Sequence, residues 1–165
     1  MANTYTKLIS YTVPSSTNSI TISSIPSTYT HLDIRLSMFE ANNSDTFRFR
    51  FNGDTGSNYT SARVYGSGTS TGADQGITNG TYFGDYLTTN TSPLATTTSL
   101  FIPNYAGSTY KSVAINHEVE TGNSATNYIQ VMSAIWNNTA AINSITIFVA
   151  SYTISVGSEI TIYGL

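Results

Sequence analysis

The chain has 165 residues, of which only 9% are charged, and its formal net charge is −3. This length fits one domain with a sizeable core, and the weakly acidic balance argues against nucleic acid as a partner, because phosphate binding requires a basic patch. The chain contains no cysteine, which excludes a disulfide framework and a thiolate metal site.

Alternation of apolar and polar residues recurs along the first half of the chain, and a two-residue period belongs to the β-strand. It predicts strands at residues 7–13, 20–22, 31–39, 47–51 and 59–65. The next segment, residues 66–80, contains five glycines and has no apolar rhythm. We expect it to form a long exposed loop.

Strands are also predicted along the second half, at residues 82–87, 96–102, 110–120, 128–136, 142–150 and 159–163. Segment 128–136 is apolar at both parities, which predicts a central strand covered on both faces. About eight to ten strands at short spacing are typical of a sandwich or barrel. We predict an all-β fold, an antiparallel jelly-roll β-sandwich of about eight to ten strands, with residues 1–165 forming a single domain.

The clearest local pattern is segment 47–51, where three phenylalanines alternate with two arginines. The phenylalanines are expected to fill the core, which places Arg48 and Arg50 together on the opposite face. The Asn52-Gly53 pair that follows predicts a tight turn, and segment 59–65 is predicted to be the strand that returns from it.

Arg48 and Arg50 are the candidate partner-binding residues. Two like charges on one strand face repel mildly, and arginine is suited to bidentate pairing with carboxylates. We therefore predict that the pair contacts acidic groups on a neighbouring subunit or on the capsid. The alternative is that the two charges protect an edge strand from aggregation, for which charge alone suffices.

The string Asp54-Thr55-Gly56-Ser57 matches the one that carries the catalytic aspartate of aspartic proteases. That chemistry needs two carboxylates that share a proton in a protected cleft, and the chain has no second such string. We interpret the string as a turn that follows a strand. The sequence therefore predicts no catalytic residue and no enzyme activity.

His31 and His117 are the only histidines and cannot by themselves hold a catalytic metal. His117 shares the parity of its apolar neighbours, which predicts a half-buried side chain whose hydrogen bonds are satisfied. Glu118 and Glu120 share the opposite face and are interpreted as a solvated pair. We predict no metal site and no cofactor.

Four stretches, taken in order, resemble one protein family. They are IPSTYTHLDIRL at 25–36, RFNGDTGSNY at 50–59, IWNNTAAINSITI at 135–147 and ITIYGL at 160–165. The set is similar to a family of virion structural proteins of tailed bacteriophages, whose members serve as head decoration (cement) proteins or as parts of tail fibres. The resemblance implies a jelly roll, a structural role and no catalytic residues.

By this resemblance we expect a decoration protein that binds the major capsid protein, or other virion subunits, on the assembled head. A homotrimer is expected, because jelly rolls of this kind usually associate around threefold positions. The alternative is a tail-fibre or receptor-binding module that recognises host surface glycan. Tyrosine-rich loops suit sugar binding, since the tyrosine ring is rigid and amphipathic.

The first residues show no charged and then apolar leader, and no apolar run approaches the length that spans a membrane. We therefore expect no membrane partner. Synthesis in the host cytoplasm and a final location in the virion follow from the resemblance.

Overall fold

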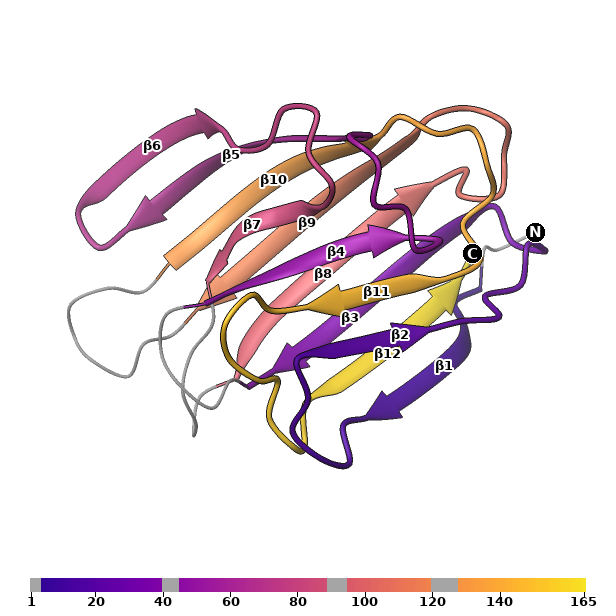
Figure 1. Ribbon diagram of the computed structural model, residues 1–165, viewed down its shortest axis with the longest axis horizontal. Coiled ribbons are helices and arrows are strands. Elements are labelled where there is room, and N and C mark those ends of the chain that lie inside the picture. Colours follow the sequence, from indigo (N-terminus) through magenta and orange to yellow (C-terminus); the bar gives the residue numbers. More distant parts are fainter. Residues whose placement is uncertain (1–3, 40–44, 89–94, 120–127) are drawn as a thin grey trace.

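The computed structural model describes residues 4–39, 45–88, 95–119 and 128–165. Within these ranges the protein consists of two antiparallel β-sheets packed as a sandwich, and it has no helix (Figure 1). No segment of this part of the chain is therefore a helix that spans a membrane. The strands are β1 (Thr6–Thr12), β2 (Ser19–Ile22), β3 (His31–Met38), β4 (Thr46–Phe51), β5 (Tyr59–Ser67), β6 (Ser70–Gln75), β7 (Phe83–Thr88), β8 (Thr96–Pro103), β9 (Lys111–Val119), β10 (Tyr128–Trp136), β11 (Ile145–Phe148) and β12 (Glu159–Gly164).

Eight of these strands follow the jelly-roll order, in which a long antiparallel hairpin is rolled into two sheets. The pairs of that hairpin are β4 with β7, β3 with β8, β2 with β11 and β1 with β12. They form the groups β1-β12-β3-β8 and β2-β11-β4-β7, so the predicted jelly-roll sandwich is confirmed. Strands β9, β10, β5 and β6 extend the first group into an eight-stranded sheet. The described ranges therefore hold twelve strands, more than the sequence predicted.

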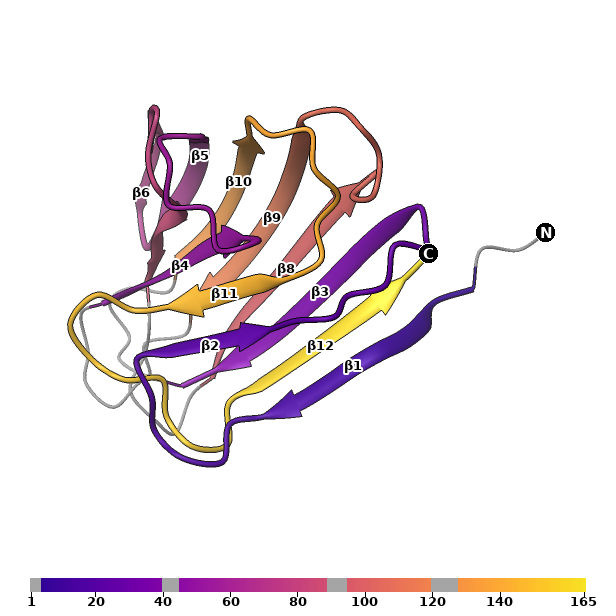
Figure 2. The ribbon, with the colours of Figure 1, turned by 45° about the vertical axis from the view of Figure 1, so that its right-hand side comes forward.

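The core lies between the two sheets, with the four-stranded sheet in front of the eight-stranded one (Figure 2). Phe47, Phe49 and Phe51 are all 0% exposed, as the alternation predicted. The ring centroid of Phe51 lies 5.2 Å from that of Phe83 and 5.6 Å from that of Trp136. Because Trp136 belongs to β10 and Phe51 to β4, this aromatic cluster joins the two sheets.

The turn after β4 forms as predicted, but the strand that follows it does not. Asn52 and Gly53 have φ angles of 52° and 65°, and Asp54 N donates to Phe51 O at 2.9 Å, which closes a tight turn. Strand β5 then pairs with β10 and β6, while β4 pairs with β11 and β7. The chain crosses to the other sheet after the turn, so the prediction of a returning strand beside β4 is wrong.

Segment 66–80 is mostly paired, and the prediction of a long exposed loop is wrong. Strand β5 continues to Ser67, the chain reverses at Gly68 (φ 55°), and β6 pairs with β5 from Ser70 to Gln75. The far part of this β5–β6 hairpin projects beyond the four-stranded sheet in both views (Figures 1 and 2). A strand that no second sheet covers has no reason to alternate apolar and polar residues, which is why the sequence pattern did not reveal β6.

Strand β10 is flanked by β9 and β5, so the prediction of a central strand is confirmed. Its Met132 and Trp136 face the core and are 2% and 1% exposed. On its other face Ile129, Val131 and Ile135 are 59%, 51% and 41% exposed. The prediction that both faces are covered is therefore wrong for the single chain.

Candidate functional site

Arg48 lies on the outer face of the four-stranded sheet, where the alternation predicted it. It forms an ion pair with Asp85 of β7, with Nη2 3.0 Å from Oδ1, and its guanidinium carbon lies 4.7 Å from the ring centroid of Tyr82. A β-bulge in the β4–β7 pair brings Asp85 to this position. Gly84 permits the bulge, since its φ is 100° and a Cβ there would lie 2.7 Å from Phe47 O.

Arg50 lies on the same face and is also engaged within its own chain. Its Nε donates to the carbonyl oxygen of Thr81 at 2.9 Å, and its guanidinium carbon lies 4.4 Å from the ring centroid of Phe148. Strand β4 lies between β11 and β7, so the alternative that the two charges protect an edge strand is wrong. Contact of Arg48 and Arg50 with an acidic partner stays a prediction.

Asp54 is the centre of a hydrogen-bond network that ties the turn after β4 to the end of β10. Its Oδ2 accepts from Trp136 Nε1 at 2.7 Å and from Asn58 Nδ2 at 2.9 Å, and its Oδ1 accepts from Gly56 N at 2.8 Å. Partial burial raises the pKa of Asp54, but these hydrogen bonds outweigh it and hold the pKa below its ordinary value. The aspartate of the protease-like string thus holds the turn after β4 against the end of β10.

Two other polar residues, His117 and Lys111, are buried with their own partners. His117 is 0% exposed and its Nδ1 lies 2.9 Å from Thr98 Oγ1, so this histidine is satisfied but more deeply buried than predicted. Lys111 is also 0% exposed, and its Nζ donates to the carbonyl oxygens of Gly107 and Thr139 at 2.7 and 3.4 Å. Within the described ranges no group of three or more acidic or imidazole side chains is placed to hold a metal ion.

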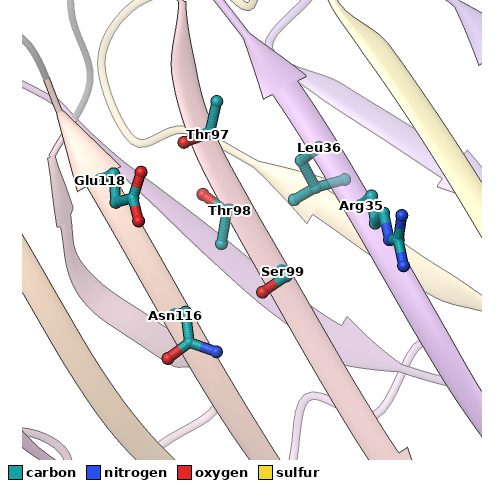
Figure 3. A pocket seen from close by; sticks show the side chains of 7 residues that line it. All are labelled: Arg35, Leu36, Thr97, Thr98, Ser99, Asn116 and Glu118. Carbon is teal, nitrogen blue, oxygen red and sulfur yellow. The ribbon is translucent and has the colours of Figure 1, made fainter.

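A shallow depression lies on the outer face of the eight-stranded sheet, over β3, β8 and β9 (Figure 3). Its volume is about 270 Å³. Thr97 and Ser99 of β8 carry the hydroxyl groups, Asn116 and Glu118 stand on the β9 side, and Arg35 stands on the β3 side (Figure 3). We name these five residues the hydroxyl trough. Glu120, the predicted companion of Glu118, lies outside the described residues.

The same outer face is apolar further along the sheet, over β5 and β10. Val64 is 54% exposed and pairs directly with Val131, so its side chain continues the row of exposed apolar residues on β10. We name Val64, Ile129, Val131 and Ile135 the apolar strip. Between and beside them stand small residues, and a hollow of about 600 Å³ is lined in part by Ala62, Ala73 and Ala114.

Neither surface was predicted from the sequence as a site. The signal for the apolar strip was present, since segment 128–136 is apolar at both parities, but the missing cover was expected within the chain. The hydroxyl trough depends on the register of β3, β8 and β9, in which Ser99 stands between Arg35 and Asn116. No pattern along the chain encodes that register.

Comparison with known proteins gave no identification. No protein-family model, no curated protein sequence and no solved structure matches this chain.

Proposed function

We propose that the chain is a non-enzymatic structural subunit of a bacteriophage virion, and that it decorates the assembled head by binding the major capsid protein. The resemblance of its four stretches to virion proteins motivates this proposal. The jelly-roll sandwich agrees with the fold that the resemblance implies.

The observation that carries the structural role is the apolar strip. Single exposed apolar residues are normal on a protein surface, whereas a group of adjacent ones marks a surface that contacts another protein. Here four β-branched aliphatic side chains, each 41% exposed or more, lie on two paired strands. In an assembled particle, a neighbouring subunit would cover such a surface.

The occupant of the apolar strip in this proposal is a neighbouring copy of the chain in a homotrimer. None of the four strip residues carries a charge, so a neighbouring copy can cover the strip without desolvating an unpaired ion. In a threefold ring the interface is heterologous, which means that the strip of one copy meets a different surface of the next. The trimer then binds the capsid as one unit.

The copy number of the protein in purified particles tests the decoration role. Quantitative mass spectrometry would compare this chain with the major capsid protein, before and after the tails are removed. Decoration predicts a copy number close to that of the capsid subunit, unchanged when tails are lost. A copy number that is a small fraction of the capsid subunit's and falls with tail removal would favour the tail-fibre alternative.

A further inference from the structure

We infer that the hydroxyl trough, together with the exposed ring of Phe101, binds an uncharged saccharide. This inference does not depend on the place of the chain in the virion, and it concerns a sheet face rather than the tyrosine-rich loops. It is carried by the shape of the trough, by its balance of charge and by the aromatic ring at its end.

The trough arises from the lengths of side chains on three neighbouring strands. Strands in a sheet lie about 4.8 Å apart, so the short side chains of Thr97 and Ser99 on β8 leave a depression between Arg35 on β3 and Asn116 and Glu118 on β9. The register places Ser99 beside both Arg35 and Asn116, and Thr97 beside Glu118. Thr97 and Ser99 therefore place two hydroxyl groups in the floor, which Leu36 and Thr98 also line. The sides carry the Asn116 amide, the Glu118 carboxylate and the Arg35 side chain (Figure 3).

Phe101 is the next residue of β8 that points outward after Ser99, and it is 39% exposed. Its position is constrained by His31, whose ring centroid lies 5.5 Å away. An aromatic face carries partial negative charge and attracts the weakly positive C–H groups that one face of a sugar ring presents. A sugar ring stacked on Phe101 would direct the next ring of the chain along β8 into the trough.

Arg35 is held in place before any ligand arrives. Its Nε and Nη2 donate to Asp33 Oδ2 at 3.3 and 2.9 Å, and its guanidinium carbon lies 5.5 Å from the ring centroid of Tyr5 and 5.1 Å from that of Tyr163. A side chain fixed in this way loses little conformational entropy when a ligand packs against it. Asp33 also neutralises the positive charge of Arg35.

The charges around the trough disfavour an anionic ligand. An anion would meet the exposed Glu118 carboxylate, and the positive charge of Arg35 is already paired with Asp33. Sugar hydroxyls both donate and accept hydrogen bonds, as do the hydroxyl groups of Thr97 and Ser99, and the Asn116 amide offers both functions. An extended peptide is disfavoured, because β8 is paired on both sides with β3 and β9 and has no free backbone edge to which a strand can add.

Saturation-transfer NMR on the full chain tests the inference with four uncharged probes: maltohexaose, cellohexaose, xylohexaose and mannohexaose. We expect transfer to at least one of them at millimolar concentration, and weaker transfer to an anionic hyaluronan hexasaccharide. Phe101→Ala should raise the Kd for the bound hexasaccharide about tenfold or more. Tyr152→Ala is the matched control, because Tyr152 is 38% exposed but lies between β11 and β12.

A second variant keeps the test valid if Phe101→Ala does not fold. Ser99→Gln fills the trough with a longer neutral side chain and should abolish binding while the circular dichroism spectrum stays unchanged. The inference is overturned if none of the four sugars shows transfer, if the hyaluronan fragment binds more tightly than all of them, or if Phe101→Ala and Ser99→Gln both bind as the wild type does. Each of these results leaves the copy number in particles, and hence the proposed function, unaffected.

Discussion

At the scale of single residues, the carboxylate of Asp54 connects segments that are remote in sequence. It accepts from the indole of Trp136, 82 positions away, and from two groups of its own turn. We expect Asp54→Asn to lower the free energy of unfolding by about 1–3 kcal/mol, the usual effect of weakening hydrogen bonds to a charged group. Urea unfolding would measure it, with Thr55→Ala at the exposed neighbouring position as a control without effect.

The stabilisation that the Asp54 carboxylate provides is expected to depend on pH. Hydrogen bonds hold the pKa of Asp54 below 3.8 in the folded protein despite its partial burial, and the same holds for Asp45, which accepts from Ser151 N at 2.6 Å. The stability from a lowered pKa is present above the unfolded value and is lost as pH falls through the folded one. Wild-type stability should therefore fall below about pH 4, and Asp54→Asn should flatten that fall. An equally steep fall in the variant, or acid proteolysis by the wild type, would contradict this role.

Substitutions of Phe49 and of the two arginines beside it test the two faces of β4 separately. Phe49 is 0% exposed, and Phe49→Ala should cost about 3–5 kcal/mol of stability through the cavity it leaves. Arg48→Ala with Arg50→Ala removes an ion pair and two cation–π contacts at a partly exposed face, which should cost about 1–2 kcal/mol in total. Equal losses in the two variants would show that the outer face is as tightly packed as the core.

The lysine variant of the same pair addresses the predicted acidic partner. Lys at positions 48 and 50 keeps both charges but loses bidentate geometry. If the arginines contact a neighbouring subunit, binding to particles should weaken and become more dependent on salt. Unchanged affinity and salt dependence would show that Asp85 and the aromatic rings account for both arginines.

At the scale of elements, the β5–β6 hairpin depends on one arginine. Arg63 contacts Asp74 of β6 with Nε–Oδ1 2.9 Å and Nη2–Oδ2 3.1 Å, and its Nη1 donates to Gln130 Oε1 of β10 at 3.1 Å. Its guanidinium carbon lies 4.4 Å from the ring centroid of Tyr65. One side chain thus joins three adjacent strands, β6, β5 and β10.

Arg63→Ala should therefore loosen β6 while leaving the rest of the sandwich intact. We expect amide hydrogen exchange in residues 70–75 to become about tenfold faster or more, as expected for a local opening that is easier by about 1.4 kcal/mol. Exchange in β3 and β12 should not change. Arg48→Ala serves as the control, and a uniform increase of exchange across both sheets would contradict the local role of Arg63.

The same elements show what the sequence predicts and what it leaves open. Alternation is a local property, so it predicted the core faces of β3 and β4 and indicated a sandwich or barrel. The contact of Asp54 with Trp136, the crossing of β5 to the other sheet and the place of Arg63 depend on residues far apart in sequence. Strand β6 was not predicted because an uncovered strand carries no alternation. Strand β10 was predicted to be covered on both faces because it is apolar at both parities, but the single chain covers only one of them.

At the scale of the whole molecule, the outer face of the eight-stranded sheet has a part lined by polar side chains and a part lined by apolar ones. Its polar part is the hydroxyl trough on β3, β8 and β9, and its apolar part is the strip on β5 and β10. The two parts adjoin, because Asn116 pairs with Val131 and Glu118 pairs with Ile129. A neighbouring copy on the apolar strip would therefore border the trough, whose hydroxyl groups lie one strand further along, on β8.

The strip can be tested by placing a charge in its centre. Val131→Glu puts a carboxylate where the proposal buries an apolar side chain, and burying an unpaired charge is costly. Because Val131 is 51% exposed in the single chain, the fold should tolerate the change. We expect the variant to remain folded by circular dichroism, to be monomeric by light scattering where the wild type is trimeric, and to bind poorly to particles that lack the protein.

Ser10→Glu is the matched control, since it adds the same charge to the same sheet face. Ser10 lies on β1 at the opposite edge, on the row that runs through Thr161, Arg35 and Asn116 to Val131. It should leave both the oligomeric state and particle binding unchanged, because the proposed contact does not include that edge. A monomeric wild type would refute the trimer, and a Val131→Glu protein that still forms trimers and binds particles would show that the apolar strip is not the contact surface.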